Sequence, residues 1–173
     1  EEATGFDLVE WMVRQAAGDM PPLDSFTIQP RGVSIQTRVY AENPAKEFQP
    51  SSGILTAVEF SADARVETWI ERGIEVSAYY DPMLAKIIVH APEREEAIAK
   101  LLAALENTSL YGIETNLAYL GQILRSAVFR NGQSHTQFLN GFHYQSHSIN
   151  VLNAGVQTMI QDYPGRIGYW NVG

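Results

Sequence analysis

Residues 32–53 read GVSIQTRVYAENPAKEFQPSSG, and this stretch decides the fold that the sequence predicts. Its first half alternates between two sets of positions, one mostly apolar or β-branched and one mostly polar: Val33, Ile35, Thr37, Val39 and Ala41 against Ser34, Gln36, Arg38, Tyr40 and Glu42. A period of two over ten residues predicts a strand with one buried face. The Asn43-Pro44 pair ends this strand, and the run PSSG at 50–53 makes a second stop.

Arg38 lies mid-strand on the polar face, with Gln36 and Tyr40 two residues to either side. A guanidinium on a rigid strand, with neighbours able to orient it, suits the binding of a planar oxyanion. The alternative is structural, with Arg38 paired to Glu42 or to a carboxylate on the next strand. The strand alone leaves both interpretations open.

Composition limits the remaining possibilities. A chain of 173 residues with 45% hydrophobic residues can form one domain with a true core and part of another. The net charge of −8 argues against nucleic-acid binding and against an anionic membrane surface. Because there is no cysteine, disulfides and thiolate metal sites are excluded, and we expect a cytoplasmic protein. The four histidines show no metal-binding spacing, and neither a signal peptide nor a membrane-spanning run is visible.

Three helices are expected along the chain. The first has Thr4 as its N-cap and Gly18 as its stop, with Trp11 and Met12 on a stripe that we expect to be core. The second starts at Pro92, with glutamates in its first turn, and the third starts near Thr115 as its N-cap. The chain opens with two glutamates and no methionine, so we expect a piece of a longer polypeptide.

Strands are expected at 54–60, 65–70 and 83–89. The run MLAKIIV at 83–89 is almost continuously apolar, which is typical of a central strand buried on both faces. Lys86 within it must reach a carboxylate or the sheet edge, and we favour a structural ion pair. Helix, then strands, then helices predict an α+β fold, an antiparallel sheet with flanking helices.

Six segments, in order, resemble the C-terminal part of a biotin carboxylase over roughly residues 1–142. They are TGFDLVEWMVRQAAG, GVSIQTRVYAENP, FQPSSG, YYDPMLAKII, R-x-x-A-I-x-K-L-x-x-A-L and GIETNLAYL. The resemblance implies that residues 1–30 are the last helix of an ATP-grasp region with its connector, and that residues 31–142 are the biotin carboxylase C-terminal domain. It also implies an ATP-dependent ligase that activates bicarbonate and carboxylates protein-linked biotin.

The same resemblance assigns roles to four residues. Arg38 matches the arginine of the family pattern R-[IVL]-x-A-E-x-P, which lies by bicarbonate and the biotin ureido oxygen and is thought to stabilise the biotin enolate. Such a cation, aimed at charge that develops in the transition state, would lower the barrier. Tyr80, Asp81 and Lys86 match Y-D-x-[ML]-[IL]-x-K and are expected to line or support that region on the biotin side.

Several family features are absent from this chain. The glycine-rich phosphate loop, the ATP-binding lysines, the metal-binding glutamates and the biotinyl-lysine motif A-M-K-M do not occur. We therefore expect ATP and Mg to bind mainly to an upstream region, no metal site here, and biotin on a carrier domain outside this chain. The expected partners are that carrier domain, the rest of the carboxylase chain and a second copy in a homodimer. The fragment alone is expected to be inactive.

The last residues resemble a second carboxylase domain. After a linker at 143–148, residues 149–173 contain AGVQTMIQDYPGRIGYWNVG, which is similar to the start of the carboxyltransferase half of urea carboxylase, related to allophanate hydrolase subunit 2. The implied reaction of the whole enzyme converts ATP, bicarbonate and urea to allophanate, with a fused upstream hydrolase domain left open. Asp162 and Arg166 are either part of its active site or a salt bridge in a tight turn.

Two other classes remain open. The domain could be non-catalytic, positioning the biotin carrier or forming a subunit interface of another biotin-dependent carboxylase, with Arg38 structural. It could also belong to a non-biotin ATP-grasp ligase of the purine-synthesis type, against which YYDPMLAK, TNLAYL and the tail argue.

Overall fold

The computed structural model describes residues 1–146, 148–153 and 156–161. Its helices are α1 (Leu8–Ala17), α2 (Arg94–Glu106), α3 (Leu117–Arg125) and α4 (Ala127–Arg130), with short 3₁₀ turns at Leu23–Ser25, Pro44–Lys46 and Phe138–Gly141. Its strands are β1 (Val33–Tyr40), β2 (Glu42–Asn43), β3 (Gln49–Pro50), β4 (Gly53–Ile54), β5 (Ala57–Glu59), β6 (Arg65–Thr68), β7 (Glu75–Val76), β8 (Met83–Ala91), β9 (Ser109–Tyr111), β10 (Ser148–Asn153) and β11 (Val156–Gln161).

The centre of the fold is a three-stranded antiparallel sheet in the order β1-β8-β6. The predicted central strand is confirmed, since β8 lies between the other two and is mostly buried. The predicted alternation of β1 is confirmed as well, because Ile35 and Val39 are buried whereas Gln36 and Arg38 are exposed. The register shifts between Val39 and Tyr40, so a bulge-type irregularity lies one residue beyond Arg38. The α+β fold with an antiparallel sheet is thereby confirmed.

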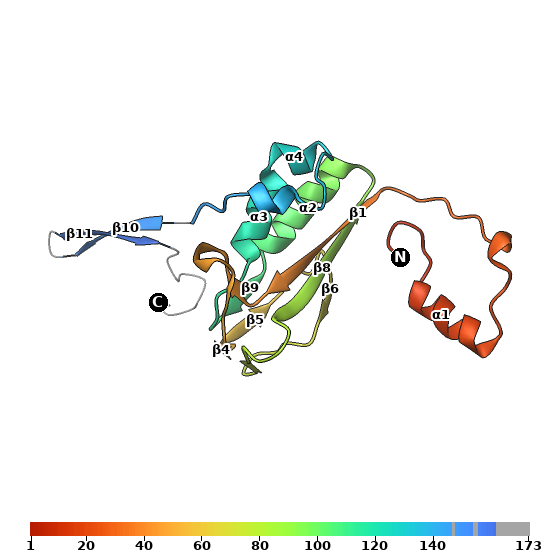
Figure 1. Ribbon diagram of the computed structural model, residues 1–173, viewed down its shortest axis with the longest axis horizontal. Helices are drawn as coiled ribbons and strands as arrows, with labels where there is room; N and C mark the ends of the chain where they lie inside the picture. Colours follow the sequence, from red (N-terminus) through yellow and green to blue (C-terminus); the bar gives the residue numbers. More distant parts are fainter. Residues whose placement is uncertain (147, 154–155, 162–173) are drawn as a thin grey trace.

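Helices cover one face of this sheet (Figure 1). The helix α2 packs across β8 and β1, and α3 and α4 pack against α2. Their apolar side chains and the inward face of the sheet form one core, which includes Ile35, Val39, Leu84, Ile87, Val89, Ile98, Leu101, Leu105 and Leu124. The helix α2 begins at Arg94 after Glu93, two residues beyond the predicted start at Pro92. Asn116, rather than the predicted Thr115, is the residue before α3.

The prediction of one continuous strand at 54–60 is wrong. The structure divides it into β4, which pairs with β7, and β5, which pairs with β9. Between them the chain changes partners, because Leu55 N donates to Ile74 O (2.9 Å) and Thr56 N donates to Tyr111 O (2.8 Å). Gly112 permits this close crossing, since a Cβ there would lie 2.0 Å from Ile54 O.

The first helix stands apart from the sheet (Figure 1). Asp7, not Thr4, is its N-cap, and its carboxylate accepts from Val9 N and Glu10 N. The predicted stop at Gly18 is confirmed, with a left-handed φ of 76°. The prediction that Met12 is core is wrong for this chain, because 71% of the side chain is exposed.

The segment that follows the last 3₁₀ turn contacts α3. The amide of Gln122 clamps residue 145, since its Nε2 donates to Gln145 O (2.7 Å) and its Oε1 accepts from Gln145 N (3.0 Å). The ring of Tyr119 contacts those of Phe142 and Tyr144 on the same side. The predicted strand starting at 149 is confirmed as β10, which forms a hairpin with β11. Asp162 and Arg166 lie outside the described residues.

Candidate functional site

The candidate site is the face of the sheet that the helices leave open. Directly paired residues of an antiparallel sheet point to the same face, and Lys86 of β8 is paired with both Arg38 of β1 and Glu67 of β6. These three side chains therefore form one row across the open face. Gln36, Ile88 and Arg65 form the next row. The structure thus brings two of the predicted residues, Arg38 and Lys86, side by side.

Lys86 makes the structural ion pair that the sequence predicted. Its Nζ lies 2.5 Å from Glu67 Oε2, and the other carboxylate oxygen of Glu67 lies 2.6 Å from Arg65 Nη2. Arg65 continues the network to Glu1 (2.8 Å) and Glu2 (2.9 Å). The hydrogen bond from Lys86, followed by that from Arg65, holds the pKa of Glu67 below its usual value. Sequence reasoning missed Glu67 as the partner, although it lies on the polar side of the predicted strand 65–70.

Arg38 differs from these neighbours. Its side chain is exposed and forms no ion pair or hydrogen bond with any residue that the structure describes. The predicted structural alternative, a pair with Glu42, is wrong. Burial, and then the charge of Asp81, raises the pKa of Glu42. Because Glu67 is already shared by Lys86 and Arg65, the guanidinium of Arg38 is available to an external anion.

Tyr80 and Asp81 lie in the loop that leads into β8, near the end of β1, where Tyr40 pairs with Met83. The carboxylate of Asp81 accepts a hydrogen bond from Met83 N (2.8 Å), so it fixes the start of β8. Tyr80 is 82% exposed, and its ring is turned to solvent. The two residues therefore stand at one end of the open face, and neither touches Arg38 through an interaction within the described chain.

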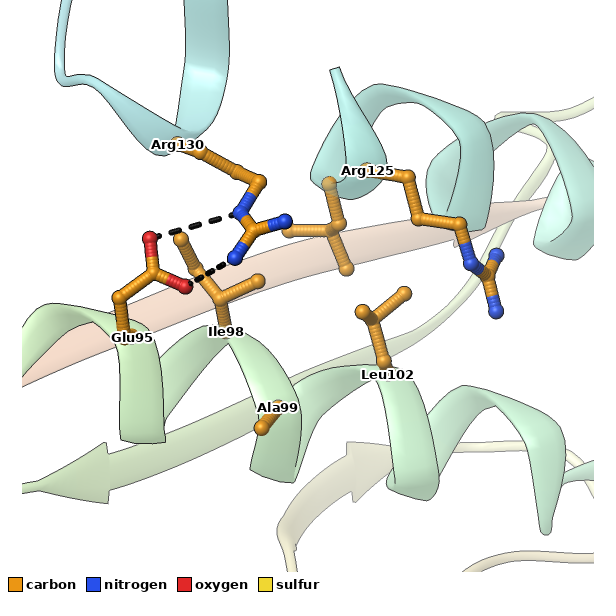
Figure 2. A pocket seen from close by; sticks show the side chains of 7 residues that line it. Glu95, Ile98, Ala99, Leu102, Arg125 and Arg130 are labelled. Atoms are coloured by element: carbon orange, nitrogen blue, oxygen red, sulfur yellow. Dashed lines mark hydrogen bonds and ion pairs between the residues drawn. The ribbon is translucent and has the colours of Figure 1, made fainter. Parts of the chain in front are cut away.

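A groove lies on the opposite, helical side of the domain. Ile98, Ala99, Leu102 and Leu124 form its apolar lining, with Arg125 and Arg130 at its margin. Figure 2 shows Arg130 directed at Glu95, and their closest atoms are 2.6 Å apart. Arg125 is likewise paired, with Glu106. Both arginines are thus occupied, so this groove is a weaker candidate than the open face.

The described residues contain no group of three or more His, Cys, Asp or Glu side chains arranged to hold a metal ion. In that same part of the chain, no helix has the length and apolarity needed to cross a membrane. On the open face, Arg38 with its ordered neighbours offers cationic binding and orientation.

The described part of the chain thus forms a sheet with one helical layer, and its open face presents Arg38, whose side chain has no ion pair among the described residues. The profile of the biotin carboxylase C-terminal domain matches residues 36–141. The chain belongs to this family.

Individual relatives are consistent with this family. The chain is 50% identical over 173 residues to the urea amidolyase of Saccharomyces cerevisiae, covering 100% of this chain but 9% of that protein. The crystal structure of Kluyveromyces lactis urea carboxylase matches with a TM-score of 0.81 and 51% identity, over 97% of this chain and 15% of that one. The biotin carboxylase domain dimer of Hydrogenobacter thermophilus 2-oxoglutarate carboxylase, solved with MgADP and bicarbonate, matches with a TM-score of 0.74 and 35% identity, over 80% and 31% of the two chains. The chain thus spans about a tenth of the length of the curated relatives that it resembles along its full extent.

Proposed function

We propose that this chain is the part of a urea carboxylase that presents Arg38 to the ureido group of carrier-linked biotin during its carboxylation. The observation that carries the proposal is the unpaired guanidinium of Arg38, held on a rigid strand of the open face while its cationic neighbour Lys86 is paired with Glu67. The alignment of residues 36–141 with the family supports the assignment of this strand.

The proposed role of Arg38 is electrostatic. If a base from the rest of the enzyme took the proton of the ureido nitrogen, negative charge would develop on the ureido oxygen. The preoriented guanidinium of Arg38 would stabilise that charge more in the transition state than in the ground state. Arg38 loses no internal partner when it binds, because the structure describes none for its side chain. The binding free energy is therefore available for catalysis.

Lys86, Asp81 and Tyr80 have supporting roles in this proposal. The Lys86–Glu67 pair fixes the row in which Arg38 stands, and Asp81 anchors the first residue of β8. Tyr80 is exposed at the end of the open face, where it can contact the biotin carrier domain. None of the three is assigned a proton transfer.

Biotin supplies the nitrogen that accepts the carboxyl group, and ATP with Mg²⁺ supplies the activation of bicarbonate. Arg38 suits the ureido oxygen because a guanidinium donates hydrogen bonds to a carbonyl or to an oxyanion. ATP and Mg²⁺ belong to an upstream region in this proposal, since the described residues offer no metal-holding group. A second copy of the enzyme, in a dimer, and a cytoplasmic location complete the proposal.

The assignment to urea as acceptor depends on the end of the chain. Residues 143–148 act as the linker and residues 149–173 as the start of the carboxyltransferase domain, in which Asp162 and Arg166 would contribute to the site. The similarity to a urea amidolyase runs through all 173 residues, whereas a complete methylcrotonoyl-CoA carboxylase alpha subunit matches 83% of the chain. This difference in coverage supports urea as the acceptor.

The test uses the full-length enzyme that contains this chain. We expect urea to stimulate bicarbonate-dependent ATP hydrolysis, and avidin to abolish the stimulation by sequestering biotin. Acetyl-CoA and pyruvate serve as matched acceptor controls and should give no stimulation. An enzyme that urea leaves unstimulated, or that avidin does not inhibit, would contradict the proposal.

A further inference from the structure

We infer that Asn116 is a positioning residue for Arg38, holding the backbone of β1 at the point from which the guanidinium projects. This inference rests on the proposed role of Arg38 and extends it to a residue 78 positions further along the chain. It begins from the free edge of β1, which has β8 on one side and, among the residues that the structure describes, no neighbouring strand on the other.

Asn116 occupies that free edge. Its Nδ2 donates to Arg38 O (3.2 Å), its Oδ1 accepts from Tyr40 N (2.9 Å), and its backbone N donates to Tyr40 O (3.2 Å). The residue thus hydrogen-bonds three outward-facing backbone groups of β1, as a paired strand would. Only 5% of Asn116 is exposed, so these bonds are protected from competition by water.

The side chain of Asn116 does not cap the helix that follows it. Asn116 stands at the N-cap position of α3, where an asparagine side chain commonly accepts from backbone N–H groups of the first helical turn. Here it makes no such bond, and the amide is used entirely on β1. A residue needed only to start the helix would not have to be oriented in this way.

The hydrogen bonds of Asn116 also lie at the irregular part of β1. The register of β1 against β8 shifts between Val39 and Tyr40, the residues directly after Arg38. Bulges of this kind increase local twist and redirect neighbouring side chains. A strand that is irregular at one edge and unpaired at the other would let the Arg38 backbone move, and Asn116 removes that freedom by bonding to both sides of Val39.

The polarity of the amide makes the requirement specific to asparagine. One end must donate to Arg38 O and the other must accept from Tyr40 N. An aspartate of the same size keeps the acceptor, loses the donor and sets a negative charge beside a carbonyl oxygen. A leucine of similar size loses both bonds. Displacements of about 1 Å at a catalytic group can lower a rate by about 100-fold, so we expect losses of about 10- to 100-fold.

The test is a double-mutant cycle in the full-length enzyme, with carboxylation of biotin by labelled bicarbonate as the readout. We expect Asn116→Leu to lower kcat by about 10- to 100-fold while leaving KM for ATP unchanged, with Asn116→Asp intermediate. In the Arg38→Ala background, Asn116→Leu should cause no further loss, because the residue acts through Arg38. Asn116→Asp repeats the cycle with an isosteric side chain if the leucine variant does not fold.

The control is Thr108→Val, which also removes a buried hydrogen bond, from Thr108 Oγ1 to Ala104 O (2.8 Å), but one that does not involve β1. The inference is overturned if the effects of Asn116→Leu and Arg38→Ala multiply, or if Asn116→Leu lowers kcat no more than Thr108→Val does. Full activity of the Arg38→Ala single variant overturns the proposed function, and the inference with it. The single variant and the cycle therefore distinguish the two failures.

Discussion

Truncation of Leu101 tests the packing that supports the open sheet. Leu101 is fully buried on the face of α2 that packs against the sheet, whereas its neighbour Leu102 is partly buried and lines the outer groove. Leu→Ala at a fully buried site costs about 3–5 kcal/mol, and we expect about 3.5 kcal/mol for Leu101→Ala. Leu102→Ala should cost about 1.2 kcal/mol, because less of its surface is removed from water. The small change in helix propensity is common to both.

The assay is unfolding of the 173-residue chain in guanidinium chloride, followed by far-ultraviolet circular dichroism. With a denaturant slope of about 4 kcal/mol/M, the transition midpoint should fall by about 0.9 M for Leu101→Ala and about 0.3 M for Leu102→Ala. Equal shifts in the two variants would refute the assignment of the buried face of α2. Wild-type stability in Leu101→Ala would refute the location of the core.

Three further predictions follow from single contacts. Gly112→Ala should destabilise the chain in the same assay, because the new Cβ meets Ile54 O at 2.0 Å with φ at +106°; unchanged stability would refute that close approach. The lowered pKa of Glu67 stabilises the fold above the ordinary carboxyl value of 4.5 and less so in acid. The stability difference between wild type and Glu67→Gln should therefore shrink from pH 7 to pH 3, and a constant difference would contradict the pair with Lys86. Gln122→Ala should speed hydrogen exchange at the amide of Gln145, and unchanged exchange would argue against the clamp.

The sequence predicts the parts of the fold that a periodic pattern specifies. The alternation of β1 and the apolar run of β8 predict their burial, because a core on one side fixes which residues point inward. The prediction of one strand at 54–60 is wrong because the chain changes its pairing partner between β4 and β5. That change depends on the close approach of Gly112, which is far away in the sequence. The prediction that Met12 is core is wrong because an apolar stripe on a helix does not show whether another element packs against it.

The candidate site was predicted in part. A lysine in a buried strand requires a partner, so the ion pair of Lys86 could be expected, but its identity as Glu67 depends on strand register. The pairing of Arg38 with Glu42 was a reasonable local alternative, and the structure does not contain it. Asn116 could not be found from sequence, since an asparagine before a helix is expected to cap that helix.

The most direct test of the central claim is the rate at which bicarbonate carboxylates biotin in the full-length enzyme after Arg38→Ala. The matched control is Arg72→Ala, which removes an exposed arginine in a turn outside the paired residues of β1, β8 and β6. Loss of preoriented electrostatic stabilisation predicts a fall in kcat of about 100-fold or more for Arg38→Ala and an unchanged rate for Arg72→Ala. A rate within about twofold of wild type for Arg38→Ala would contradict the claim that this arginine acts on the developing charge.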